Sequence, residues 1–204
     1  MIKKKKSKKS DEAYDSACQY LKGSRSFSKE KGVALLKELA DGGHAKAQYN
    51  LGICFHEGVG CEISHETAFH YFKLAAAQKH PRAIYTLGCY FISGFNGVVD
   101  EGMGAQCMRL AADLGVADAQ YDLGVLLLSG KGIEKSEAQA VHYFKLAADQ
   151  GHADAECNLG LCYCHGIGVQ KSVEEGIRYL EQAVRQGQKK AVQLLEKILM
   201  MTVH

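Results

Sequence analysis

Apolar and polar positions along residues 45–188 repeat with a fixed period of 36 residues. Every copy carries an alanine and, four residues later, a leucine–glycine pair, with the leucines at Leu51, Leu87, Leu123 and Leu159. A period of this length indicates one supersecondary unit that buries its apolar face against its neighbours. The sequence therefore predicts four full units, at residues 45–80, 81–116, 117–152 and 153–188.

Each unit is predicted to contain two helices, because apolar residues recur at three- and four-residue spacing on both sides of a glycine-bearing turn. In the unit at 45–80 the helices are expected over residues 46–57 and 65–79. The residue before each second helix is a good N-cap, and the five caps are Ser28, Ser64, Asp100, Ser136 and Ser172. Ser172 and Glu175 also have the spacing of a capping box. These signals predict an all-α chain.

The second helices share an apolar face that is expected to form the core. Its large members are Phe72, Met108, Phe144 and Leu180. The pattern weakens outside the four units, so residues 11–44 are interpreted as a degenerate first repeat with a shortened turn near Gly23. Residues 189–204 are interpreted as a capping helix, in which Glu196 replaces the repeated glycine. Residues 1–10 are predicted to be a basic, disordered tail.

The segments AKAQYNLGICFHEGVG, ADAQYDLGVLLLSGKGI and AVHYFKLAADQGHADA resemble the Sel-1-like repeat family, whose members are relatives of tetratricopeptide repeats. The segment GFNGVVDEGMGAQCMRLAAD departs most from the pattern. The resemblance implies a solenoid, a right-handed α/α superhelix of antiparallel helix pairs with 36-residue repeats. It also implies a protein-binding adaptor or scaffold rather than an enzyme, with a protein or peptide of unidentified nature as the partner.

In such a solenoid the outward residues of the first helices form an extended binding surface. Tyrosines at one register would suit an extended peptide, since tyrosine offers contact area with a polar tip. The same tyrosines would serve packing between repeats equally well. The candidate partner-binding residues are Lys46, Tyr49, Asn50, Ile53, His56, Arg82, Tyr85, Asp118, Tyr121, Asp122, Asp154 and Asn158. Further members of the same registers are Cys89, Ile92, Val125, Leu128, Cys157, Leu161 and Cys164.

The densest cluster of metal-ligand residue types is Cys157, Cys162, Cys164 and His165. A tetrahedral zinc site needs four ligands that converge on one point, which a single helix does not supply. We therefore predict no metal and no cofactor, and interpret the eight cysteines mostly as small hydrophobic residues. A metal- or redox-responsive thiol protein that uses Cys157, Cys162 and Cys164 is the alternative hypothesis. Secreted members of the resembled family can carry disulfides between the two helices of a repeat, but the second helices here contain only Cys107.

No catalytic constellation is recognisable in the sequence. It contains no nucleophile elbow, no phosphate-binding glycine loop and no zinc-protease helix. His44, His80 and His152 recur at the same repeat boundary, which favours a structural role for them. The chain is therefore predicted not to be an enzyme and to have no small-molecule substrate.

Charge separates the N-terminal tail from the repeats. Six of the 25 basic residues are lysines within the first nine positions, which leaves 19 basic against 23 acidic groups elsewhere. Nucleic-acid binding by the repeats is therefore not expected. The run KKKKSKK resembles a minimal nuclear-import signal and supports a second alternative, an RNA- or membrane-associated factor that acts through this tail. The sequence predicts no transmembrane segment, a cytoplasmic location, and the nucleus as the alternative set by the lysine run.

Overall fold

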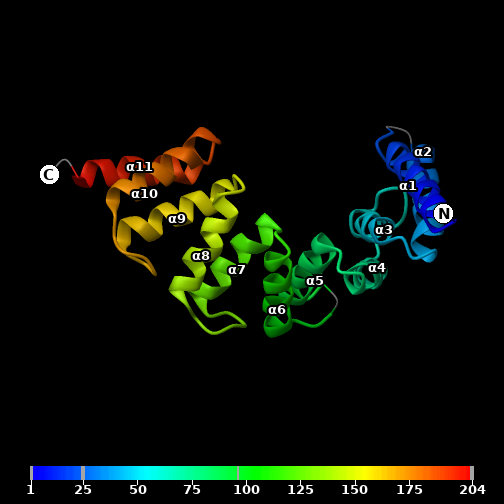
Figure 1. The fold of residues 1–204 in the computed structure, drawn as a ribbon, viewed down its shortest axis with the longest axis horizontal. Coiled ribbons are helices and arrows are strands. Elements are labelled where there is room, and N and C mark those ends of the chain that lie inside the picture. The colour runs from blue at the N-terminus through cyan, green and yellow to red at the C-terminus, as the bar shows by residue number, and fades with distance from the viewer. Residues whose placement is uncertain (1, 24–25, 96, 203–204) are drawn as a thin grey trace. The chain divides into compact units, whose positions relative to one another are not determined.

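The computed structural model describes residues 2–23, 26–95 and 97–202, and in these ranges the regular elements are eleven helices, with no strand. The chain divides into two compact units, residues 1–99 and 100–204, called here the N-terminal and the C-terminal unit. Figure 1 labels the helices of each. The boundary falls inside the predicted repeat at 81–116, so the two helices of that repeat belong to different units.

The N-terminal unit contains five helices in its described residues, and helices that follow one another in the chain pack together. Their bounds are α1 Ile2–Leu21, α2 Ser26–Asp41, α3 Ala45–Glu57, α4 His65–Ala77 and α5 Pro81–Ser93. The core lies between the helix pairs and includes Leu36, Leu51 and Cys54.

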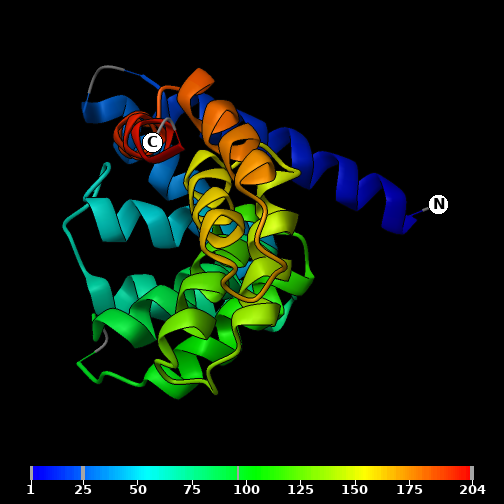
Figure 2. The ribbon, with the colours of Figure 1, turned by 90° about the vertical axis from the view of Figure 1, so that its left-hand side faces the viewer.

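The C-terminal unit contains six helices in its described residues, and it repeats the same hairpin arrangement. Their bounds are α6 Glu101–Asp113, α7 Ala117–Ser129, α8 Glu137–Ala148, α9 Ala153–His165, α10 Val173–Arg185 and α11 Lys189–Thr202. Helices α9 and α10 lie side by side in Figures 1 and 2 (yellow and orange). Leu180 of α10 and Cys157 of α9 are fully buried in the core under α11.

Four of the five predicted N-caps are confirmed. Ser64, Asp100, Ser136 and Ser172 each accept a hydrogen bond from the backbone N–H three residues later. The prediction for Ser28 is wrong, because α2 begins at Ser26 and the Ser28 hydroxyl donates to the carbonyl oxygen of Tyr20 at 3.0 Å.

The predicted capping box at Ser172 forms only in half. The Ser172 hydroxyl accepts from the Glu175 N–H at 3.2 Å, but the Ser172 N–H donates to the carbonyl oxygen of Tyr163. The Glu175 carboxylate instead accepts from the Arg178 guanidinium at 2.6 Å. A charged donor one turn away competes successfully for the carboxylate, since charge-assisted hydrogen bonds are the stronger kind.

The glycine of the repeated leucine–glycine pair makes room for the aromatic ring of the second helix. A Cβ at Gly52 would lie 2.5 Å from the ring of Phe72, and a Cβ at Gly124 would lie at the same distance from the ring of Phe144. Both rings are fully buried, as are Met108 and Leu180 at the same register. The predicted core face of the second helices is therefore confirmed.

The second glycine of each turn allows one repeat to approach the next. Gly60 has a φ of 71°, and a Cβ there would lie 2.6 Å from the carbonyl carbon of Lys29 at the start of α2. Gly132 and Gly168 make the same approach to the backbone of Glu101 in α6 and of Glu137 in α8. At these three positions glycine allows the left-handed backbone and, because it has no side chain, the close approach.

Residues 2–10 differ from the expected disordered tail, because α1 begins at Ile2 and runs without interruption to Leu21. Lysine is a good helix former, and neither glycine nor proline interrupts this stretch. The side chains of residues 2–9 lie outside those that the structure describes. At the other end, α11 occupies residues 189–202 of the expected capping helix.

Candidate partner-binding surface

Two of the candidate tyrosines are packed against histidines that cap the next first helix. Tyr49 stacks on His80 with 4.8 Å between ring centroids, and Tyr121 stacks on His152 at 4.7 Å. Nδ1 of each histidine accepts the N–H of the third residue beyond it, which fixes the ring at the start of α5 or α9. Packing between repeats therefore accounts for the rings of Tyr49 and Tyr121.

The neighbouring asparagines also bond within the chain. Asn50 donates to the hydroxyl of Tyr14 at 2.7 Å. The amide of Asn158 lowers the pKa of the Tyr121 phenol, against a larger opposing effect of burial. Burial, followed by the carboxylates of Asp154 and Asp122, raises the Tyr121 pKa overall. The Tyr121 hydroxyl therefore lies at an acidic edge of the C-terminal unit.

The other candidates divide by exposure. The four charged residues at the start of the first helices are exposed, namely Lys46, Arg82, Asp118 and Asp154. The remaining members, Ile53, His56, Tyr85 and Asp122, are half-buried. Each unit therefore carries two exposed charges at the starts of its first helices, together with half-buried candidates.

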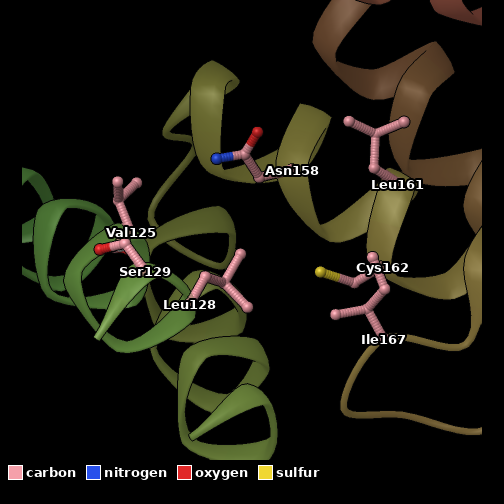
Figure 3. Close-up of a pocket in the computed structure, with 7 residues that line it drawn as sticks. All are labelled: Val125, Leu128, Ser129, Asn158, Leu161, Cys162 and Ile167. Carbon is pink, nitrogen blue, oxygen red and sulfur yellow. Dashed lines mark hydrogen bonds between the residues drawn. The ribbon is translucent and has the colours of Figure 1, made fainter. Parts of the chain in front are cut away.

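A pocket opens between α7 and α9 on this side of the C-terminal unit (Figure 3). Its volume is about 360 Å³, and its lining is Val125, Leu128, Ser129, Asn158, Leu161, Cys162 and Ile167. The Cys162 thiol points toward Leu128 across the opening, while Asn158 and Ser129 supply polar groups at the rim (Figure 3). We call these seven residues the α7–α9 groove.

Three of the seven equivalent registers of the N-terminal unit hold aromatic side chains. Tyr90 holds the register of Cys162, His56 that of Leu128 and Phe95 that of Ile167. The Tyr90 hydroxyl bonds to Nδ1 of His56 at 2.6 Å, and the ring of Phe95 lies 5.4 Å from that of Tyr90 and 5.5 Å from that of His56. His56, a candidate partner-binding residue, is therefore engaged inside its own unit.

Three groove residues were not among the candidates, and each was missed for a reason. Cys162 was interpreted as a small hydrophobic residue and is 2% exposed, yet it lines the groove at the register that Tyr90 holds in the other unit. Ser129 ends α7 and Ile167 belongs to the following turn, where a helical face count does not reach. The drop in side-chain size from Tyr90 to Cys162 was the available signal.

The charges at the starts of the first helices are opposite in the two units. Lys46 and Arg82 lie near His80, whose pKa is lowered by burial and then by these two cations. In the C-terminal unit Nε2 of His152 lies 3.5 Å from the carboxylate of Asp118, which holds the register of Lys46. The histidine cap is thus placed in a basic setting at His80 and in an acidic setting at His152, whereas Nε2 of the cap His44 in the N-terminal unit lies 3.4 Å from the carboxylate of Asp11.

The three cysteines of the alternative thiol hypothesis lie in the interior of the C-terminal unit. Cys157, Cys162 and Cys164 are buried, and burial raises the pKa of each, to about 11 for Cys162. All eight cysteines are free, and no group of three or more metal-ligating side chains occurs in the described part of the chain. A buried thiol with a raised pKa is a poor nucleophile and a poor metal ligand at neutral pH.

These features define a class of protein: tandem helix pairs with capped first helices and glycines that admit the neighbouring repeat. The family described as Sel1 repeat matches the chain at residues 45–80, 81–116, 117–152 and 153–188. The chain belongs to the Sel1 repeat family, and its fold is the helical solenoid of that family.

Solved structures give the same result. A Sel1 repeat protein from Oxalobacter formigenes is 34% identical over 83% of this chain and 50% of that protein, with a TM-score of 0.78. The protective antigen c5321 of uropathogenic Escherichia coli, which displays an SLR fold, is 25% identical over 95% of this chain and 42% of that protein, with a TM-score of 0.88. The chain therefore spans half or less of these two proteins.

The immunity protein Pa5087 of Pseudomonas aeruginosa shares the fold at 22% identity, over 90% of this chain and 68% of that protein, with a TM-score of 0.57. No curated protein matches the chain. Among the helices that the structure describes, none has the length and apolar content that crossing a membrane requires.

Proposed function

We propose that this chain is a protein-interaction scaffold that binds an extended segment of a partner along the first helices of its C-terminal unit. The α7–α9 groove receives an apolar side chain of that segment. The observation that carries the proposal is the open, largely apolar groove at registers that aromatic rings fill in the N-terminal unit. A non-enzymatic role agrees with the Sel1 repeat fold and with the use of the repeated histidines as helix caps.

The composition of the groove suits a side chain of a protein better than a polar metabolite. Its volume of about 360 Å³ lies at the lower end of the usual range for ligand pockets, which is about 300–1,000 Å³. Four of its seven residues are aliphatic, and the polar groups of Ser129 and Asn158 stand beside them. The Asn158 amide can bond the backbone of a bound segment while its side chain is buried. The Ser129 hydroxyl donates to the carbonyl oxygen of Val125 at 3.0 Å and can accept from that backbone.

The proposal is tested with a displayed library of random decapeptides, selected on the purified chain. We expect the selected peptides to be enriched in leucine, isoleucine, methionine or phenylalanine at one position. Val125→Asp places a charge at the mouth of the groove at a residue that is 39% exposed, so the fold tolerates it. Because burial of one apolar side chain is worth about 1.5–3 kcal/mol, this variant should lower recovery of those peptides roughly tenfold or more.

The matched control is Leu110→Asp, since Leu110 is an exposed leucine on α6 of the same unit and lies outside the groove. The control should select the same peptides as the unaltered chain. Equal recovery by Val125→Asp and the unaltered chain would show that the groove is not the binding site. Selection of peptides without any apolar preference would reject the proposal as well.

The cytoplasmic location stays a prediction, and so does the nuclear alternative, because the side chains of Lys3–Lys9 lie outside those described. A chain that lacks residues 1–10 separates the tail from the repeats. Under our proposal it selects the same decapeptides as the full chain, and a loss of that selection would place part of the binding site in the tail.

A further inference from the structure

Three acidic residues of the C-terminal unit lie on the helix faces that lead to the α7–α9 groove. On α7, Asp118, Asp122 and Val125 stand at spacings of four and three residues, which places them on one face of the helix. On α9, Asp154, Asn158 and Leu161 repeat the same spacing at the same registers. Two parallel stripes therefore run from an acidic end to an apolar end.

Contacts within the unit join the two ends of this surface. Asn158 lines the groove, and its amide and the carboxylates of Asp154 and Asp122 all act on the Tyr121 phenol. Asp118 lies beside His152, and Asp154 accepts from Gln188, yet both aspartates are exposed and keep acceptor capacity. The residue 36 positions after Asp154, at the same register, is Lys190 on α11. The series of acidic residues at this register therefore ends at Asp154.

We infer that this surface selects a segment of its protein partner in which a lysine or arginine stands about three residues from the apolar side chain in the groove. The inference rests on the proposed function, since it assigns the chemistry of the segment that the groove binds. The spacing follows from helix geometry. Asp154 and Leu161 are seven residues apart, which is about 10.5 Å along the helix axis at 1.5 Å per residue. An extended peptide covers that length in about three residues.

Charge complementarity is the reason for a basic rather than an acidic residue. Three carboxylates, Asp118, Asp122 and Asp154, belong to the two stripes, and the N-terminal unit has Lys46 and Arg82 at the register of Asp118 and Asp154. A basic residue gains attraction on the C-terminal unit, whereas an acidic residue would be repelled there. The acidic end thus confers selectivity, and the groove contributes the burial of apolar area.

The test is the decapeptide selection repeated on a charge-reversal variant, Asp118→Lys with Asp154→Arg, which copies residue types found at this register in the N-terminal unit. The matched control is Glu134→Lys with Asp149→Lys, which makes the same change in net charge at exposed residues of the same unit outside the groove. Far-ultraviolet circular dichroism and the thermal midpoint of all three proteins establish that the comparison is made between folded chains.

We expect lysine and arginine to be enriched about threefold at three residues from the apolar position on the unaltered chain and on the control, as suits exposed ion pairs. On the reversal variant the same position should become depleted in basic residues and enriched in aspartate and glutamate. The preference should also weaken when the salt concentration is raised to about 0.5 M.

The outcomes separate this inference from the proposed function. Apolar enrichment without any charge preference overturns the inference and leaves the groove as the binding site. A basic preference that the reversal variant retains also overturns it, because the aspartates are then not its cause. Absence of apolar enrichment, with or without a charge preference, rejects the proposed function itself.

Discussion

The N-terminal and C-terminal units place different side chains on the same helical frame. In the N-terminal unit the rings of Tyr90, His56 and Phe95 pack together between α3 and α5. In the C-terminal unit the equivalent registers hold Cys162, Leu128 and Ile167, and a groove is open. Side-chain size at these three positions therefore decides whether the space between two neighbouring first helices is packed or stays open as a groove.

The largest expected effect is a difference in unfolding free energy between substitutions of Tyr90 and Cys162, which hold the same register. Tyr90 is 2% exposed and packs against four other rings besides its hydrogen bond to His56, so Tyr90→Ala should lower the free energy of unfolding by about 3–5 kcal/mol. Cys162→Ala removes one small group beside an existing opening and should cost about 1 kcal/mol. Urea unfolding of both variants measures the difference, and equal costs would contradict the contrast between a filled and an open register.

The next effect concerns a feature in which the two units do not differ. Gly52 faces Phe72 and Gly124 faces Phe144 at the same 2.5 Å from the position of an added Cβ. Each Gly→Ala change should therefore cost about 1–3 kcal/mol through overpacking. Thermal unfolding of the two single variants should show similar losses, and a loss confined to one of them would mean that the two repeats are packed differently.

A smaller effect on stability is expected at the register of the buried residues Gln48 and Gln120, where the third repeat compared carries the carboxyl group of Glu156. Gln48 and Gln120 donate to the carbonyl oxygens of Ala40 and Ala112, but Glu156 at the same register has no amide with which to bond Ala148. Glu156→Gln should raise the stability at pH 7 by about 1 kcal/mol, because an ionised carboxylate cannot donate. Gln48→Glu is the reverse test and should lower it.

The pH dependence of the effect of Glu156→Gln follows from the direction in which the pKa of Glu156 is shifted. Burial raises the pKa of Glu156 above its ordinary value of 4.5, while Gln186 and then His152 act in the opposite direction. Stability from the protonated form is present below pH 4.5 and is lost as the pH rises through the raised pKa. The advantage of Glu156→Gln should grow as the pH is raised from 4 to 7, and an advantage independent of pH would exclude ionisation as its cause.

The smallest effect compares the histidine caps. The pKa of His80 is lowered by burial and by the cations Lys46 and Arg82, so folding favours the neutral ring. Its contribution to stability is present above pH 6.5 and is lost as the pH falls below that value. Lys46→Asp with Arg82→Asp, which copies the aspartates at this register in the C-terminal unit, should raise the His80 pKa in a proton NMR titration. An unchanged pKa would show that burial alone controls this ring.

Much of the fold could be predicted from the sequence because each repeat contains the same local signals. The leucine–glycine pairs, the turn glycines and the N-caps at Ser64, Asp100, Ser136 and Ser172 each act within a few residues, so their spacing is visible in the chain. The exceptions are positions where a competing bond prevails. Ser28 bonds to Tyr20 across a turn, and the Glu175 carboxylate bonds to Arg178 rather than completing its capping box.

The site was predicted only in outline. Counting along a helix identified the face that carries Val125, Leu128, Asn158 and Leu161, because that face depends on helical periodicity alone. The opening itself depends on how much volume two neighbouring helices leave between them, and on Ile167 from a turn. This volume depends on the sizes of individual side chains at equivalent positions, such as Tyr90 and Cys162. A pattern of apolar and polar positions contains no information about these sizes.

The central claim is that the C-terminal unit binds a partner segment in the α7–α9 groove and that the N-terminal unit does not bind it at the equivalent registers. Methyl NMR of the full chain, titrated with the best decapeptide from the selection, tests this most directly. The account predicts shifts at the methyl groups of Val125, Leu128, Leu161 and Ile167, with Ile53 unchanged. Shifts at Ile53 with the groove methyl groups unchanged would contradict it.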